Sequence, residues 1–448
     1  MLPLPILHRH FFGQPASFEP VDSLPDLQFL YDHKSERRAN SDGSGSLVTT
    51  NNTAFKWWED RSGNGLHVSH ANGAILHVNG SDRVTQFSGG DKILSSSWTP
   101  GTLGDYTIHY VMRRIADDIG CVATLLASGG SSFFGAPWTV DTVTAPGMSA
   151  GSPWPARTKA IYVAITRSGT TLTVYVNGTP VTTATNSTTI TPGVIQLGRY
   201  STTTYTNFYL SSLAFATSAH SQAQIQSYYN WLRTELHTEF GRSSNLALYL
   251  SNSLGTASFS GLANGIVQKV HTGGLAPSFT HYLNASVSSK TTTMMQADYL
   301  TRIVPLADTT TGRVVIFLWE GTNDMVVNGA SGATAAANIF TLVQSLNAAF
   351  SNVKVVVGTV IDRNASGWSA SSGVPGTKKA DFNNAIVDSG NQSTYGYTVA
   401  DFTGVATVSG DGANANATYF ADGVHLTSTG NGEIDNIVGT AMESALSA

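Results

Sequence analysis

The pattern of apolar and polar residues changes character near residue 243. Before about residue 216, apolar residues alternate with polar ones in short runs, separated by clusters of Gly, Asn, Ser and Thr. Alternation with a period of two is typical of β-strands that bury one face. Strands are expected, among others, at residues 107–111, 160–165, 172–176 and 194–197, and Asn177-Gly178 predicts a tight hairpin after the third of these. Many short strands with few helices predict an all-β jelly-roll sandwich.

One amphipathic helix is expected at residues 221–240, after the strands. Its apolar residues share one helical face: Ile225, Tyr228, Tyr229, Leu232 and Leu236. Ser218 or Ser221 is the expected N-cap, and Gly241 is the expected stop. A multidomain chain follows, with a first domain at residues 1–242 and a second at 243–448.

The second half shows apolar runs without alternation. Residues 246–250, 313–318 and 353–360 are rich in Val, Ile and Leu, as are strands buried on both faces of a parallel sheet. Helical patterns follow them at 338–350, 378–389 and 431–447. This alternation predicts a three-layer α/β sandwich with a parallel, flavodoxin-like sheet.

Composition restricts the chemistry. Charged residues make up 12% of the chain, about half the usual share, and the net charge of −5 favours neither nucleic acid nor anionic membranes. The single cysteine, Cys121, excludes an intrachain disulfide and is expected to be buried. Asp411-Gly412-Ala413-Asn414 resembles half a calcium loop but lacks its central glycine and glutamate. No metal and no cofactor is therefore expected.

The sequence offers no membrane segment. It contains no apolar run of 18 residues, and residues 1–12 lack the features of a signal peptide. The polar, weakly charged composition still suggests an extracellular protein, or one on a virion or cell surface, whose signal has been removed or which is exported by another route.

Candidate chemistry appears only in the second half. Ser253 follows the strand at 246–250 and is placed at the carboxyl edge of the sheet, where α/β folds bind ligands. A serine hydroxyl needs a base to become a nucleophile, and an imidazole held by a carboxylate supplies one. Of His271, His281 and His425, only His425 follows an aspartate at a suitable spacing, as Asp422-x-x-His425.

Attack on an ester also requires hydrogen-bond donors for the oxyanion. The side-chain amide of Asn323, in an expected loop, is one candidate, and the backbone N–H of Ser253 is a second. Gly273 or Gly274 offers a third through its backbone, and the sequence does not decide between them.

Three motifs together resemble the SGNH (GDSL) hydrolase family: Ser-Asn-Ser-Leu-Gly at 251–255, Gly-Thr-Asn-Asp at 321–324 and Asp-Gly-Val-His-Leu at 422–426. The resemblance implies an ester hydrolase with Ser253 as nucleophile, His425 as base and Asp422 orienting it. Asn323 and one of the two glycines would complete the oxyanion hole. The family usually has Gly-Asp before the serine, and here Asn252 is expected to form the same turn.

The first half resembles the concanavalin A-like (laminin G-like) domains over residues 17–240, through the motifs at 58–65, 175–178 and 195–199. This implies glycan binding or attachment, with a spacer role as the alternative. Catalysis by this half is disfavoured because no strand carries the paired carboxylates of a glycanase. Trp57, Trp58 and Trp98 are sugar-stacking candidates, but core packing is expected for at least two of them.

A second serine motif, Gly-Met-Ser-Ala-Gly at 147–151, imitates a nucleophile elbow. Two prolines follow it, at 153 and 155, so the helix that an elbow requires cannot start there. A loop is expected instead.

The leading interpretation is a serine esterase that removes small acyl groups, above all acetyl, from a polysaccharide or other glycan. One alternative is a lipase or thioesterase of the same family. Another is a glycan-binding adhesin or virion protein without activity, and Asn252 is the feature that favours it. Partners other than the acylated glycan are not expected, and the oligomeric state stays open.

Overall fold

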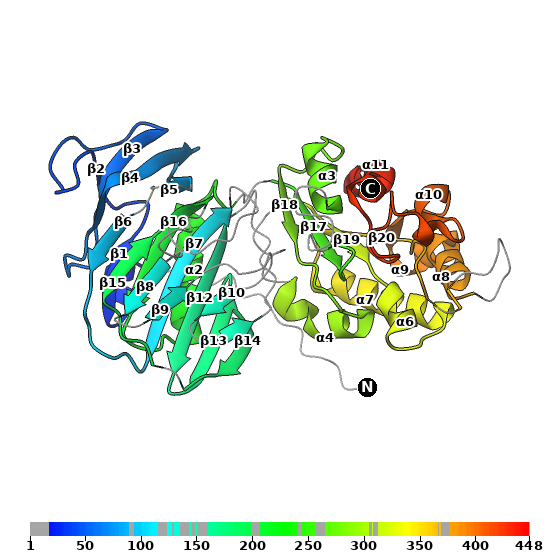
Figure 1. Cartoon of the computed structure of the whole chain (residues 1–448), viewed down its shortest axis with the longest axis horizontal. Coiled ribbons are helices and arrows are strands. Elements are labelled where there is room, and N and C mark those ends of the chain that lie inside the picture. The colour runs from blue at the N-terminus through cyan, green and yellow to red at the C-terminus, as the bar shows by residue number, and fades with distance from the viewer. Residues whose placement is uncertain are drawn as a thin grey trace.

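The computed structural model describes residues 18–88, 94–114, 123–127, 130–134, 143–145, 148–150, 160–187, 189–198, 207–240, 244–255, 265–303, 307, 312–365, 367–368 and 377–447. Figure 1 shows a β-rich half on the left and an α/β half on the right. Cys121 and the expected helix stop at Gly241 lie outside the described residues, and the domain boundary at 242 and 243 stays a prediction.

The N-terminal half is an antiparallel sheet that folds over on itself. Its strands pair in the order β14-β13-β12-β7-β16-β5-β4-β6-β15-β8-β9. In addition, β1 pairs with β16, β3 pairs with β4, and β2 pairs with β3. The strands are β1 (Leu27–Tyr31), β2 (Arg37–Arg38), β3 (Thr53–Trp58), β4 (Val68–Asn79), β5 (Asp82–Ser88), β6 (Leu94–Ser97), β7 (Tyr106–Arg114), β8 (Ala123–Ala127), β9 (Gly130–Phe134), β10 (Val143–Ala145), β11 (Met148–Ala150), β12 (Ile161–Ser168), β13 (Thr171–Val176), β14 (Thr179–Thr185), β15 (Val194–Leu197) and β16 (Asn207–Ala216).

The predicted strands and hairpin are confirmed. The four predicted segments lie in β7, β12, β13 and β15. Between β13 and β14, Asn177 and Gly178 have φ of 48° and 82°, as a turn with two left-handed residues requires. One interpretation is wrong in detail: residues 148–150 form β11, which pairs with β10, instead of a loop.

Helix α2 (Gln222–Glu235) covers the outer face of this sheet. Strand β12 is buried on both sides: Ile161 and its alternate neighbours enter the sandwich core, and Tyr162 faces α2. Ser221 is the N-cap, with its Oγ accepting from the Gln224 N–H at 3.3 Å. The helix ends before residue 240, because the chain turns back so that Glu239 O accepts from the Ala160 N–H at 2.8 Å.

The C-terminal half contains a five-stranded sheet in the order β18-β17-β19-β20-β21, and every neighbouring pair is parallel. Its strands are β17 (Leu246–Ser251), β18 (His281–Asn284), β19 (Val314–Trp319), β20 (Val353–Gly358) and β21 (Tyr397–Ala400). Its helices are α3 (Ile266–Thr272), α4 (Thr292–Arg302), α6 (Thr322–Val326), α7 (Gly332–Ala349), α8 (Lys378–Val387), α9 (Ser389–Tyr395), α10 (Ala406–Ser409) and α11 (Ser428–Ser447). The predicted fold class is confirmed in both halves.

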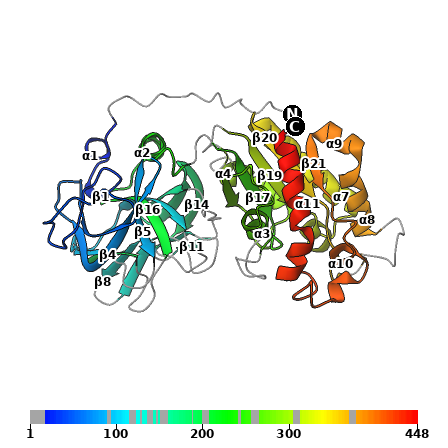
Figure 2. The same ribbon diagram turned by 90° about the horizontal axis from the view of Figure 1, so that it is seen from above.

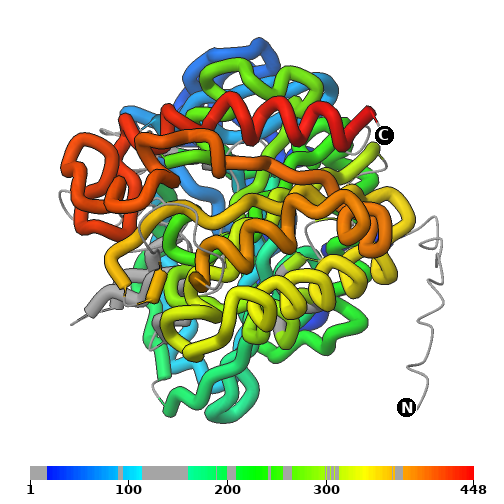
Figure 3. Tube along the Cα trace, turned by 90° about the vertical axis from the view of Figure 1, so that its right-hand side faces the viewer, coloured from blue at the N-terminus to red at the C-terminus, as the bar shows by residue number. Residues whose placement is uncertain are grey.

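Alternate residues of the central strands build the two interfaces of a three-layer sandwich. Leu246 and Leu248 pack with side chains of α4 and α7, whereas Ala247 and Tyr249 pack with α3 and α11. Figures 2 and 3 show α11, in red, crossing one side of this half, with the yellow α7 on the other. The predicted helices correspond to α7, α8 and α11, although α8 ends two residues before the predicted end and α7 starts six residues earlier than expected because Ser331 caps it.

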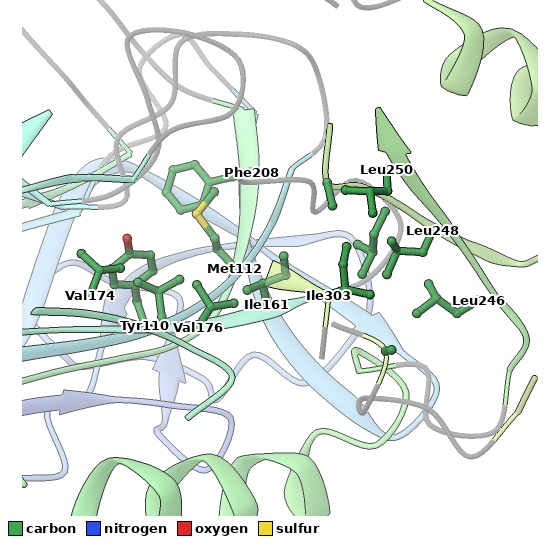
Figure 4. Close-up of a cluster of buried hydrophobic side chains, with 14 of the residues drawn as sticks. Tyr110, Met112, Ile161, Val174, Val176, Phe208, Leu246, Leu248, Leu250 and Ile303 are labelled. Carbon is green, nitrogen blue, oxygen red and sulfur yellow. The ribbon is translucent and has the colours of Figure 1, made fainter. Parts of the chain in front are cut away.

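The apolar core continues from one half into the other. Figure 4 shows Met112 and Ile161 of the N-terminal sheet on one side of Ile303, which follows α4. Leu248 and Leu250 of β17 lie on the other side of Ile303. All five side chains are at most 2% exposed. Trp58 and Trp98 are core residues at 0% and 5% exposure, as expected, while Trp57 lies against His67 and is partly exposed. None of the helices in the described ranges is long and apolar enough to cross a membrane.

Candidate active site

Ser253 lies two residues beyond β17, at the carboxyl edge of the parallel sheet. The turn is fixed by Asn252, whose Oδ1 accepts from the Leu254 N–H at 2.8 Å. This confirms the expectation that Asn252 forms the turn in place of an aspartate. Gly255 closes it, because a Cβ there would lie 2.5 Å from Ser286 Oγ and 2.6 Å from Ser251 Cβ. The sequence therefore places the hydroxyl on a short, tightly packed turn.

His425 reaches Ser253 from the loop before α11. Its Nε2 lies 2.9 Å from Ser253 Oγ, and its Nδ1 lies 2.7 Å from Asp422 Oδ2. The other oxygen of Asp422 accepts from the backbone N–H groups of Val424 and His425, at 3.0 and 2.8 Å. Gly423, at φ 77°, permits this tight turn. The three side chains that the sequence grouped are therefore brought into one hydrogen-bonded chain.

The environment keeps Asp422 ionised. Partial burial acts to raise the pKa of this carboxyl, but the hydrogen bonds from the backbone and ring of His425 and from the Val424 backbone outweigh it and hold the pKa below its usual range. The side chain of Asp422 is 45% exposed and that of His425 is 14% exposed. A carboxylate paired with Nδ1 leaves Nε2 to accept a proton from the serine.

The other two histidines of this half lie elsewhere. His271 is partly buried, stacks on Tyr282 with ring centroids 4.0 Å apart, and bonds Tyr249 Oη through Nε2 at 2.9 Å. Burial lowers the pKa of His271 to about 3, so the ring is neutral at physiological pH. His281 is the first residue of β18, at the opposite edge of the sheet from Ser253.

Asn323 lies in the first turn of α6, and the loop expected there is a short helix. Its N–H donates to Glu320 Oε1 at 2.9 Å, and its Nδ2 donates to Lys290 O at 2.9 Å. The neighbouring Asp324 is fully buried and accepts from the Thr292 N–H at 3.0 Å. The backbone of Asn323 is therefore held by Glu320, and its side-chain amide is oriented by Lys290 O.

The structure overturns the expectation that Gly273 or Gly274 contributes to this site. Both follow the C-terminal end of α3, and a Cβ on Gly439, midway along α11, would lie 2.6 Å from Leu275 O. Gly439 is 14 residues beyond His425, and most of that interval is helical, which amounts to roughly 15 Å. The glycines fail as candidates because α3 precedes β18 and so returns the chain to the amino edge of the sheet.

The loop after β18 occupies the place expected for the glycines. The Val287 N–H donates to Ser251 O at 2.9 Å, and Lys290 O accepts from Asn323 as described. Between them Ser289 has φ of 65°, an uncommon value for a residue with a side chain. The sequence contained a signal for this loop, since any parallel strand beside β17 ends at the same edge, but the four-residue β18 is too short to recognise from periodicity.

Two further charged residues beside the site were not assigned a role from sequence. Glu320 is 1% exposed and accepts from Asn252 Nδ2. Arg363 donates to Thr322 Oγ1 at 3.2 Å. Burial lowers the pKa of its guanidinium, against the raising effect of the Glu320 and Asp422 charges. Trp319, which precedes Glu320, is a fully buried core residue whose Nε1 donates to Thr359 O at 3.1 Å.

The acidic residue of the partial calcium motif has another partner. Asp411 Oδ1 lies 2.8 Å from Lys379 Nζ, which also lies 3.4 Å from Asp362. Within the described residues no group of three or more His, Cys, Asp or Glu side chains is arranged to hold a metal ion.

Two family models match the chain, one in each half. Residues 256–432 match the GDSL-like Lipase/Acylhydrolase family, which includes the Asn323 and His425 motifs. The C-terminal half is similar to the GDSL-like acylhydrolases. Residues 107–226 match the concanavalin A-like lectin/glucanases superfamily. Both resemblances drawn from the sequence are confirmed.

Several solved structures show similarity to one half of the chain. A putative GDSL-like lipase from Parabacteroides merdae is 13% identical, with a TM-score of 0.36, and the match covers 45% of this chain and 96% of that one. A putative acylhydrolase from Bacteroides fragilis is 20% identical, with a TM-score of 0.35 and coverage of 48% and 95%. A botulinum neurotoxin type C structure is 12% identical, with a TM-score of 0.35 and coverage of 48% and 53%. No curated protein matches the sequence.

Proposed function

We propose that the C-terminal half is a serine esterase that removes small acyl groups, acetyl foremost, from a carbohydrate. The observation that carries this proposal is the chain of contacts from Asp422 through His425 to Ser253 Oγ, at 2.7 and 2.9 Å. The match of residues 256–432 to an acylhydrolase family supports the same chemistry.

In this mechanism His425 Nε2 takes the proton of Ser253 as Oγ attacks the ester carbonyl carbon. The carbonyl π electrons move to oxygen, and the oxyanion accepts from the Ser253 N–H and from Asn323 Nδ2. A backbone N–H of the 287–290 loop, with Ser289 at its turn, serves as the third donor in place of Gly273 or Gly274. His425 then protonates the departing sugar oxygen, and water hydrolyses the acyl-serine by the same steps in reverse.

The surroundings of Ser253 favour a small acyl group. Polar side chains lie around this turn, among them Asn252, His425 and Ser286.

The carbohydrate part of the proposal rests on the N-terminal half. Its match to a lectin and glucanase superfamily supports glycan binding. Trp57 supplies a partly exposed aromatic ring, whose centroid lies 4.7 Å from that of His67. An indole in this position suits stacking on a sugar ring.

The test compares wild type with Ser253→Ala on p-nitrophenyl acetate, butyrate and octanoate, and on an O-acetylated polysaccharide with released acetate as the readout. We expect acetate to be preferred and kcat to fall at least about 10³-fold in the variant, with an unchanged melting temperature. A preference for octanoate would favour a lipase or thioesterase. An inactive, folded wild type that still retains the glycan would favour a binding protein, and an active Ser253→Ala would refute the serine mechanism.

A further inference from the structure

Glu320 lies between the two loops that carry the proposed chemistry. It follows β19 directly and is 1% exposed, and its hydrogen-bond partner Asn252, which follows β17, is 0% exposed. Buried carboxyl groups are rare unless their oxygens are satisfied. The location therefore calls for an explanation beyond core packing.

Every group that bonds the Glu320 carboxyl is a donor. Oε2 accepts from Asn252 Nδ2, and Oε1 accepts from the Asn323 N–H at 2.9 Å. The backbone N–H groups of Gly321 and Asp324 also donate to this carboxyl. Because Asn252 Oδ1 is already engaged by the Leu254 N–H, the amide cannot flip to offer an acceptor without losing that bond. The arrangement suits a carboxylate, which only accepts.

The backbone around Glu320 is built to allow these bonds. Gly321 has φ of 118°, and a Cβ there would lie 2.4 Å from the ring of Phe382. Only glycine fits this conformation, which turns the chain so that its N–H groups point back to the carboxyl. A second link between the same strand ends runs from Ser251 Oγ to Trp319 O at 2.6 Å.

We propose that Glu320 is a positioning residue, which fastens the Ser253 turn to the Asn323 helix through Asn252 and so sets the distance from nucleophile to oxyanion donor. It acts through these neighbours and does not touch the substrate. The pair Asn252–Glu320 also accounts for the departure from the usual Gly-Asp before the serine. Asn252 stands at the position of that aspartate, and the carboxylate is supplied instead by Glu320, its partner in the hydrogen bond. This inference rests on the proposed function.

The electrostatic setting makes the contact sensitive to pH. Burial, together with the charge of Asp324 on α6, raises the pKa of Glu320 to about 8, against the lowering effect of the backbone donors. Arg363, from the segment after β20, is the described cation that faces it, and the serine turn contributes only the uncharged Asn252. Above pH 8 the ionised carboxylate accepts all its hydrogen bonds. Below pH 8 the carboxyl group is protonated, and its O–H faces N–H donors with which it cannot form a hydrogen bond.

The decisive experiment exchanges the two partners. In Glu320→Gln, the new amide nitrogen faces either Asn252 Nδ2 or the Asn323 N–H, so one donor is left unpaired. In Asn252→Asp, two carboxyl groups meet. In the double variant, an aspartate at 252 accepts from a glutamine at 320, and the bond is restored with reversed polarity. Glu239→Gln is the matched control, since Glu239 is another buried, fully bonded glutamate but lies in the N-terminal half.

We expect kcat for p-nitrophenyl acetate at pH 9 to fall about 10- to 100-fold in each single variant, with KM changed less than about twofold. The double variant should recover to within about threefold of wild type. At pH 6.5 the deficit of Glu320→Gln should nearly vanish, because the wild-type carboxyl is then protonated. Glu239→Gln should leave kcat unchanged at both values. Single variants with full activity at pH 9, a double variant worse than both singles, or an Asn252→Asp variant faster than wild type would each overturn the proposal.

A melting-temperature cycle on the same four proteins separates this inference from the proposed function. If the wild type hydrolyses no ester, the esterase proposal fails. The contact between Glu320 and Asn252 is then judged only by whether the two substitutions change the melting temperature additively. Non-additive melting temperatures, with the double variant above both singles, would support the contact, and additive values would overturn it.

Discussion

Each half of the molecule contains a series of hydrogen bonds that runs through a histidine ring, called a histidine chain here. The two histidine chains differ in the groups at their ends. In the N-terminal half, His109 Nδ1 lies 2.6 Å from Tyr162 Oη and its Nε2 lies 2.8 Å from His220 Nδ1. His220 ends the chain at Pro25 O, 3.0 Å away. In the C-terminal half, His425 connects a carboxylate to a primary hydroxyl.

Burial separates the two chains further. His109 is 0% exposed beneath α2, and burial, with a contribution from His220, lowers its pKa well below the usual range. That ring therefore stays neutral. Because Pro25 O can only accept, His220 Nε2 donates to it, His109 Nε2 donates to His220 Nδ1, and His109 Nδ1 accepts from the Tyr162 phenol. His425 instead lies at the sheet edge with an ionised partner. Two similar hydrogen-bond chains thus have opposite uses: one stabilises packing and the other is suited to proton transfer.

The largest effect is expected when the C-terminal histidine chain loses its carboxylate, in Asp422→Asn. The asparagine keeps the turn, because its Oδ1 can still accept from Val424 and His425, but its NH₂ faces Nδ1 of the ring. His425 then carries its proton on Nε2 and cannot accept one from Ser253. We expect kcat for p-nitrophenyl acetate to fall about 10²- to 10⁴-fold with little change in melting temperature.

Asp401→Asn is the matched control for Asp422→Asn. Asp401 follows β21 and closes a similar exposed turn, in which its Oδ1 accepts from the Thr403 N–H at 2.9 Å, and it belongs to none of the three motifs. Its variant should retain full activity. Unchanged kcat in Asp422→Asn would show that the carboxylate does not orient the base.

His109→Gln should have the opposite signature, a loss of stability without loss of activity. Glutamine cannot reach both Tyr162 Oη and His220 Nδ1, so a buried polar atom is left unpaired at a cost of about 1–3 kcal/mol. We expect the melting temperature to fall by about 3–10 °C, while kcat for p-nitrophenyl acetate stays within twofold of wild type. The exposed His237→Gln serves as control, and a large drop in kcat for His109→Gln would mean that the N-terminal chain influences the catalytic site.

The sequence was sufficient for the parts of the fold that repeat a local rule. Continuous apolar runs identified β17, β19 and β20, and an Asn-Gly pair identified the hairpin after β13. The serine, histidine and aspartate could be grouped because parallel strands share a carboxyl edge and because Asp422 and His425 occupy a single turn.

What the sequence could not give depends on three-dimensional neighbours. Gly273 and Gly274 looked suitable as donors because glycine is common in oxyanion loops, yet α3 carries them away from Ser253. Ser289 has a left-handed backbone conformation, which a serine in a sequence does not predict. Glu320 accepts a hydrogen bond from Asn252 only because β17 and β19 end side by side. The edge strand β18 is too short for any periodicity to emerge.

The smallest predicted effect concerns His271, the histidine that the sequence did not select. Its pKa is lowered to about 3 in the fold, against about 6.5 in an unfolded chain. Between these values the unfolded state binds more protons, so this residue's contribution to stability is complete above pH 6.5 and is lost as the pH falls toward 3. From pH 7 to pH 5 the loss is about 1–2 kcal/mol. His271→Gln, which can still bond Tyr249 Oη, should therefore show a shallower fall in melting temperature over this range than wild type. Parallel curves would indicate that the His271 ring is protonated within the fold and would contradict this prediction.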